Sequence, residues 1–168
     1  MNRAGRLTVV MTCALLVNCS GPSENPLADG LTADQQTLLI ERTIDQIEST
    51  EQFTPDNFEQ RRRAHFETMT EEMRDPALAY LPKRLDKITM LEMSQTVELD
   101  RDSVEVESRA VGPEQAMALV TVNGSRTYHT NNASRTTETQ FALAWVITVD
   151  GAELVFRHRG IRMREIGD

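Results

Sequence analysis

The feature that most constrains the fold is a pair of alternating apolar segments that meet at Asp150-Gly151. The segments run from Gln140 to Val149 and from Ala152 to Arg164. An Asp-Gly pair in this setting predicts a β-hairpin, because the tightest hairpin turns need positive φ at their central residues. One face of the first segment is large and apolar, while the other is small and also largely apolar. This predicts a central strand with other elements packed on its larger face. The larger face carries Phe141, Leu143, Trp145, Ile147 and Val149.

The overall composition excludes several classes of protein. A chain of 168 residues fits one domain behind a leader. The net charge of −8 argues against a dedicated nucleic-acid-binding protein, which would carry a basic face. No apolar run is long enough for a conventional membrane-spanning helix. Both cysteines, Cys13 and Cys19, lie near the N-terminus. The predicted folded body therefore has no disulfide, thiol nucleophile or thiolate metal site, and no cofactor is expected.

Residues 1–19 have the parts of a bacterial export signal, with Arg3 and Arg6 before an apolar segment from Leu7 to Val17. The residues Leu16-Val17-Asn18-Cys19 resemble the lipobox of bacterial lipoproteins, in which the cysteine is lipidated. Asn18 departs from that pattern, where a smaller residue is usual. An ordinary cleaved secretory signal and a short uncleaved anchor are the alternatives. The lipobox reading predicts lipid attachment at Cys19.

The leader also sets the expected domain organisation. Residues 20–30 are rich in Gly, Pro, Ser and Asn and predict a flexible tether. Residues 31–168 are then expected to form a single periplasmic domain. Ser20 follows the cysteine, which by analogy with other lipoproteins favours the outer membrane.

Three helices are expected after the tether. Thr32 and Gln35 form a capping box for the first, which should end near Ser49-Thr50. Thr54 is the expected N-cap of the second, with Pro55 at its first helical position. Its apolar partners are Phe53 across the cap and Phe58, Phe66, Met69 and Met73 along its buried side.

The third helix is expected to begin at Asp75-Pro76, which would also end the second. Pro82 should kink or split it. Its packing stripe consists of Leu78, Leu81, Leu85 and Ile88.

Two groups on the second helix invite a functional reading. The run Arg61-Arg62-Arg63 could contact a phosphate or a partner, but a solvated face balanced by Glu59 and Glu67 is the simpler interpretation. His65 is expected to be a partly buried structural residue, because no second histidine lies one helical turn away.

Four or five antiparallel strands are expected in the second half of the chain. Ser94 to Asp100 and Val104 to Ala110 alternate and are separated by a polar turn at residues 101–103. Gly112-Pro113 breaks the chain before a long strand from Met117 to Thr130, and residues 131–134 form a hairpin loop. Gly124 and Gly160 are expected at bulges or bends.

The last predicted strand is basic in an otherwise acidic protein. One interpretation is a docking surface for an acidic partner or for the acidic helices of the chain itself. The alternative is a solvated edge strand whose charge prevents edge-to-edge association. No nucleophile elbow, phosphate loop, zinc-protease motif or paired-cysteine site occurs, so no catalytic residue and no metal ligand is assigned. His129 and His158 lie on predicted strands and have no partner by spacing. The basic residues are Arg157, Arg159, Arg162 and Arg164.

Helices followed by long antiparallel strands predict an α+β fold in which N-terminal helices pack on a curved sheet. This arrangement resembles the cone-shaped fold of the nuclear transport factor superfamily. Within it, residues 53–57 resemble the threonine-proline-capped helix of TraE-family conjugation proteins, and Asp75 to Leu81 resembles their proline-tyrosine-leucine region. Val120-Thr121-Val122-Asn123-Gly124 resembles their valine-x-valine-x-glycine strand. Asp150-Gly151 lies where that family turns into its last strand.

The resemblance spans about Phe53 to Arg164 and implies a periplasmic scaffold or adaptor of a conjugative type IV secretion machine. Such a subunit works through protein contacts in the cell envelope, without catalysis or nucleic acid. The N-terminus departs from the family, which normally has a spanning helix in the inner membrane. Here the membrane contact is expected through lipid on Cys19. A cone-fold enzyme and a lipoprotein that binds an apolar ligand remain alternatives, and a homo-oligomer stays open.

Overall fold

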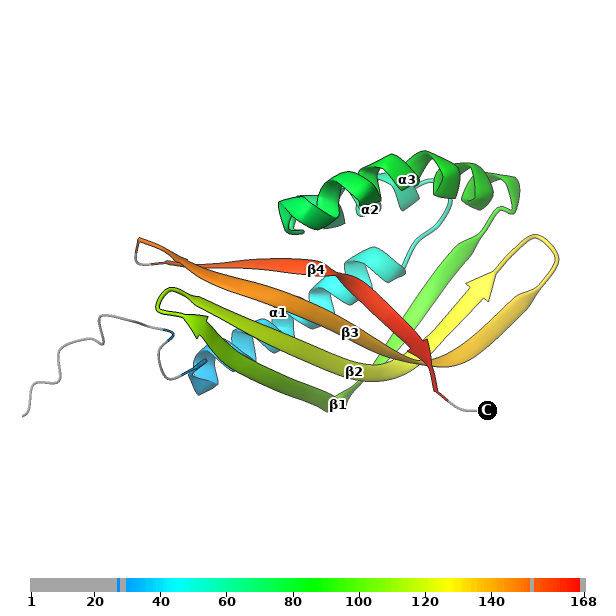
Figure 1. The fold of residues 1–168 in the computed structure, drawn as a ribbon. Helices are drawn as coiled ribbons and strands as arrows, with labels where there is room; N and C mark the ends of the chain where they lie inside the picture. Colours follow the sequence, from blue (N-terminus) through cyan, green and yellow to red (C-terminus); the bar gives the residue numbers. More distant parts are fainter. Residues whose placement is uncertain (1–26, 28–29, 152, 167–168) are drawn as a thin grey trace, which may run out of the picture.

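The computed structural model describes residues 27, 30–151 and 153–166, so the predicted leader and Cys19 lie outside the described residues. Within these ranges, three helices accompany one antiparallel sheet of four strands in the order β1-β2-β3-β4. This confirms the predicted α+β class. Figure 1 shows the sheet curving strongly, with α1 lying along one face and α2 and α3 above one end. The elements are α1 (Ala33–Glu51), α2 (Phe58–Glu67), α3 (Glu71–Met90), β1 (Ser94–Gly112), β2 (Gln115–His129), β3 (Ser134–Asp150) and β4 (Glu153–Glu165).

The start of α1 follows the sequence pattern. Thr32 N–H donates to Gln35 Oε1 at 2.9 Å, and Gln35 N–H donates to Thr32 Oγ1 at 3.3 Å. The capping box is therefore confirmed. The helix buries Leu39, Ile44 and Ile47. Leu39 and Ile47 belong to the core that α1 forms with the strands on the larger side of the sheet.

The boundaries of α2 and α3 differ from the prediction. Thr54 is not the N-cap of α2: its N–H donates to Asn57 Oδ1, and the helix begins one residue after Asn57. The predicted contact across this turn is confirmed, because the rings of Phe53 and Phe58 lie 4.9 Å apart. Phe66 and Met69 are also buried as predicted.

Neither proline of α3 ends a helix. The helix begins after Thr70, so Pro76 lies inside it, and the helix continues unbroken past Pro82. A proline removes one helical hydrogen bond. Here burial of Leu81 and Ile88 against α2 outweighs that cost.

β1 is one continuous strand where two had been expected. Its pairing with β2 shifts register between Asp100 and Glu105, so the polar residues 101–103 form a bulge and not a turn. Ser103 Oγ accepts a hydrogen bond from the backbone N–H of Asn123 at 2.8 Å, which replaces a lost ladder bond. Figure 1 shows β1 changing direction midway along its length.

Gly124 lies beside this bulge, opposite Leu99. The β2–β3 pairing runs through Gly124 without a shift, so the predicted irregularity belongs to β1. A Cβ at Gly124 would collide with the backbone carbonyl oxygen of Glu98. Glycine is therefore required here by close strand approach.

The hairpin between β3 and β4 is confirmed. Asp150 pairs with Glu153, so Asp150 ends β3 and Gly151, with φ of 61°, carries the turn. Further along, Trp145 of β3 pairs with His158 of β4. The next pair joins Leu143 of β3 to Ile161 of β4, so the register shifts between these two pairs. The predicted register shift at Gly160 is thus confirmed, and Gly160 itself has φ of 96°.

Backbone segments from the helical half form hydrogen bonds with both edge strands of the sheet. Phe53 and Gln95 exchange two backbone hydrogen bonds at the start of β1. At β4, the N–H of His158 donates to the Thr68 carbonyl, and the N–H of Thr70 donates to the His158 carbonyl. These bridges cover part of each edge and hold α2 and α3 over the end of the sheet.

Candidate functional site

The four basic residues predicted as a partner surface all lie on β4, an edge strand of the sheet. Two of them contact the helical half. Arg157 Nη1 donates to the carbonyl oxygen of Glu67, and Arg159 Nη2 lies 3.5 Å from Glu72 Oε2. These contacts agree with the expectation that the basic strand docks on the acidic helices of the chain itself.

Arg162 and Arg164 are exposed and, within the described residues, form no ion pair. They pair in the ladder with Ala142 and Gln140 of β3. No hydrogen bond or ion pair within the described residues joins Arg162 or Arg164 to the helices, unlike Arg157 and Arg159. Arg162 and Arg164 are thus the members of the predicted surface whose side chains are not engaged by the helices.

A pair of buried histidines lies between α2 and β4: His65 comes from the helix and His158 from the strand. The rings of His65 and His158 are 4.5 Å apart, and His158 is fully buried. The Trp145 ring lies 5.4 Å from that of His158 and its Nε1–H donates to Thr43 Oγ1 at 2.9 Å. His65 is buried more fully than the partial burial expected, and its partner His158 lies on a distant strand, far along the chain, which helical spacing could not reveal.

The hydrogen bonds around the pair favour neutral rings. His158 Nδ1 accepts from the backbone N–H of Gly160 at 3.0 Å, and His65 Nδ1 lies 2.7 Å from Gln46 Nε2, which can only donate. A proton on either Nδ1 would break one of these bonds. Burial, and to a smaller extent the charges of His158 and Arg62, together lower the pKa of His65 to about 2, and burial lowers the pKa of His158 to about 4.

These pKa values predict that acid destabilises the fold. In the unfolded chain both histidines bind protons below about pH 6.5, whereas in the folded protein they remain neutral. Stability contributed by the neutral pair is therefore complete above about pH 6.5 and falls as the pH drops toward 4. The expected loss at pH 5 is about 2 kcal/mol for each histidine.

Urea unfolding from pH 7 to pH 4.5 measures this loss. The double variant His65→Gln/His158→Gln should show a flatter pH dependence than wild type, whatever its absolute stability. His129→Gln, at an exposed histidine, is the control and should keep the wild-type slope. Equal slopes in the double variant and wild type would contradict the assignment.

A second buried polar contact joins α1 and α2. Arg62 Nη2 lies 3.1 Å from Glu51 Oε1, and both side chains are almost fully buried. Gln95 Nε2 donates to Glu51 Oε2 at 3.0 Å. The prediction of a solvated arginine run is thus wrong for Arg62, although Arg63 pairs with Glu59 on the surface as expected. Burial lowers the pKa of Arg62, and Glu51 partly offsets this.

The described residues hold no cluster of three or more His, Cys, Asp or Glu side chains suited to a metal ion. Among the helices in the described ranges, none is both long and apolar enough to cross a membrane. Two features that sequence reasoning missed are the His65–His158 pair and the Glu51–Arg62 pair. Each joins residues from different elements, and no local spacing carries that signal.

Comparison with known proteins gives similarity at the level of structure. No protein-family model matches the chain, and no curated protein sequence matches it. Among solved structures, the periplasmic domain of DotI is 9% identical, with a TM-score of 0.62, over 80% of this chain and 96% of that one. VirB8 of Agrobacterium tumefaciens is 10% identical, with a TM-score of 0.55, over 82% of this chain and 96% of that one.

A third similar structure is an IcmL-like type IV secretion system protein from Legionella pneumophila. It is 12% identical, with a TM-score of 0.54, over 79% of this chain and 94% of that one. A TraE protein solved with 2-(2-furyl)isonicotinic acid is also similar, with 10% identity and a TM-score of 0.52. These matches span nearly the whole of each neighbour. The chain therefore has the curved α+β fold of VirB8-like and TraE-like type IV secretion domains.

Proposed function

We propose that this protein is a non-catalytic periplasmic scaffold or adaptor of an envelope complex of the type IV secretion kind. The observation that carries the proposal is the fold, which similar domains named as type IV secretion system components share over nearly their full length. The charged and apolar surface of the protein and the export signal expected from the sequence also support this proposal.

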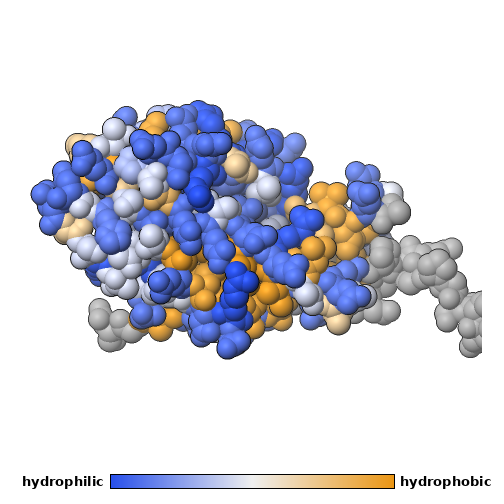
Figure 2. Space-filling view, turned by 180° about the vertical axis from the view of Figure 1, so that it is seen from behind, coloured by the Kyte–Doolittle hydropathy of each residue, from blue (hydrophilic) through white to orange (hydrophobic). Residues whose placement is uncertain are grey.

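The surface offers contacts suited to protein partners. Arg162 and Arg164 form an exposed basic edge on an acidic protein. Figure 2 shows that apolar surface also gathers in the lower middle of the face seen from behind, among hydrophilic side chains. Contiguous apolar surface rimmed by polar residues is typical of protein interfaces. Together these features support a role in binding other subunits, another copy of the chain included.

The buried histidines argue for a structural role over a catalytic one. A general base works best with a pKa near the working pH. Burial holds the pKa of His158 at about 4 and that of His65 at about 2, and both Nδ1 atoms already accept hydrogen bonds from within the fold. The pair is thus better suited to joining α2 and β4 than to proton transfer.

Membrane attachment is proposed through lipid on Cys19, with the outer membrane favoured by Ser20. The variant Cys19→Ser should move from the membrane pellet to the soluble periplasmic fraction. A variant that still pellets with membranes would end the lipid-anchor part of the proposal. It would leave the scaffold part standing.

The scaffold part is tested by crosslinking the tagged protein in its own cell envelope and identifying what co-purifies by mass spectrometry. Secretion-channel subunits should be recovered with wild type. Arg162→Glu/Arg164→Glu should lose them, whereas Arg101→Glu/Arg109→Glu, an equal charge change on exposed β1 residues, should keep them. Recovery of the protein without any channel subunit would overturn the proposal.

A further inference from the structure

A cleft lies between α3, the bridge residue Phe53 and the end of β2. It has a volume of about 530 Å³, within the range of ligand-binding pockets. Its walls combine aromatic and apolar side chains with a row of exposed cations from α3. The lining residues are Phe53, Tyr80, Lys83, Arg84, Lys87, Ile88, Met93 and Tyr128.

The charge of this cleft is opposite to that of the protein. Its lining contains three cations and no carboxylate, although the chain has a net charge of −8. Lys83 and Lys87 are the only lysines in the sequence, and both are here. Within the described residues, neither lysine nor Arg84 forms an ion pair. Arg84 is also close enough to Arg62 to help lower the pKa of that buried guanidinium.

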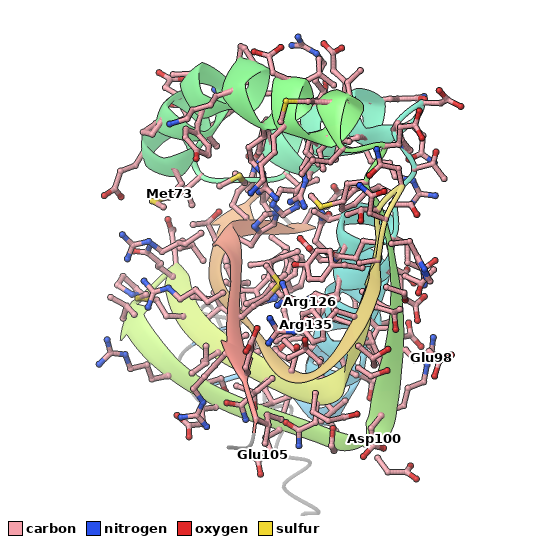
Figure 3. The ribbon with its side chains drawn as sticks, turned by 90° about the vertical axis from the view of Figure 1, so that its right-hand side faces the viewer. Met73, Glu98, Asp100, Glu105, Arg126 and Arg135 are labelled. Atoms are coloured by element: carbon pink, nitrogen blue, oxygen red, sulfur yellow. The ribbon has the colours of Figure 1, made fainter. Side chains whose placement is uncertain are left out.

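A buried arginine lies behind the inner wall of the cleft. Arg126 is 8% exposed, and its guanidinium lies 4.8 Å from the centre of the Tyr128 ring. Its nearest carboxylate atom, Glu165 Oε1, is 3.8 Å from Nη2, and its Nε has no hydrogen-bond partner in the described structure. Figure 3 shows Arg126 on the concave side of the sheet, below α3. The positive charge at this end of the cone is therefore only partly neutralised.

The mixture of groups indicates what kind of ligand would fit. Cations along α3 suit carboxylates, while the tyrosine rings and the apolar floor suit an adjacent aliphatic or aromatic side chain. Nucleic acid is a poorer match, because its affinity depends on many phosphate contacts and the protein as a whole has a net charge of −8. An acidic peptide supplies both a few carboxylates and apolar side chains.

We propose that this cleft binds an acidic peptide segment of a partner protein. Its carboxylates contact Lys83, Arg84 and Lys87, and an apolar side chain of the segment lies between Tyr80 and Tyr128. This site is separate from the basic edge of β4. It can be tested with the purified protein whether or not the chain belongs to a secretion complex.

The test uses the full chain in detergent and a rhodamine-labelled peptide of alternating Glu and Leu residues. Fluorescence anisotropy should show binding that weakens as salt is added. The same peptide with Gln in place of Glu should bind at least about tenfold more weakly. Carbodiimide, which joins a carboxylate to an amine, should link the acidic peptide to Lys83 or Lys87 in peptide maps.

Three double variants separate an effect of the site from an effect of net charge. Lys83→Glu/Lys87→Glu should raise the Kd about tenfold or more. Lys83→Arg/Lys87→Arg should keep the Kd within about twofold, because the charge remains, yet lose the crosslink. Arg101→Glu/Arg109→Glu changes the net charge equally, away from the cleft, and should bind as wild type does.

Several results would overturn the proposal. These are no binding of the acidic peptide, equal binding of the Gln peptide, and equal loss in the Arg101/Arg109 variant. A labelled single-stranded oligonucleotide that competes at lower concentration than the peptide would instead assign the cleft to nucleic acid. Lys83 and Lys87 are exposed, so their substitution should not disturb the fold. Circular dichroism of each variant checks this.

Discussion

Replacement of Trp145 by alanine is expected to lower the free energy of unfolding by about 3–5 kcal/mol. Trp145 is 3% exposed at the centre of the larger face of β3, in contact with the rings of Phe156 and His158. Its loss would leave a cavity between the sheet and α1. It would also leave Thr43 Oγ1 without the N–H that it accepts.

Urea unfolding followed by far-UV circular dichroism measures this loss, because the variant has no tryptophan left to report by fluorescence. Val146→Ala, on the opposite and half-buried face of the same strand, is the matched control and should cost far less. If Trp145→Ala were as stable as wild type, Trp145 would not be part of the core and the assigned faces of β3 would be wrong.

The second large effect is expected at the buried ion pair. Glu51→Gln keeps the shape of the side chain and an oxygen for Gln95, but it leaves the Arg62 charge buried without a counter-ion. Breaking a buried pair from one side costs about 3–5 kcal/mol. Desolvation, which already lowers the pKa of Arg62, is the physical cause.

A double-mutant cycle separates the pair from the individual side chains. Glu51→Gln/Arg62→Met removes both charges and should be more stable than Glu51→Gln alone, because no uncompensated charge is then buried. The exposed pair Arg63–Glu59 is the control, and Glu59→Gln should change stability by less than about 1 kcal/mol. Additive losses around the Glu51–Arg62 cycle would show that the two charges do not stabilise each other.

Elements that depend on a short stretch of sequence could be predicted correctly. The capping box at Thr32, the alternating faces of β3 and the turn at Gly151 all depend on a few neighbouring residues, and each is confirmed. The errors have a common cause. Taken locally, Asp75-Pro76 is typical of a helix boundary and the polar residues 101–103 are typical of a turn. In the folded protein α3 and β1 continue past these residues, because tertiary packing stabilises the longer elements.

The site was less predictable than the fold. Arg62 belongs to a charged run that is typical of a solvated face, and only the position of Glu51 at the end of α1 makes it a buried partner. Lys83 and Lys87 look like ordinary exposed residues of a helix until Tyr128, from a distant strand, completes the cleft. Such groups depend on how elements are placed in space, which periodicity does not encode.

The bridge between residues 68–70 and β4 has a consequence for the order in which the molecule can be assembled. Thr68 and His158 are 90 positions apart, so the contact closes a very long loop and is expected to form late in folding. The helices α2 and α3 precede the sheet in the chain, yet the strand that holds them is the last to be made. A growing chain must therefore carry the side chains of His65 and Met69, which lie against His158 and Gly160, without these partners until almost every residue has been added. During that interval they are open to chaperones.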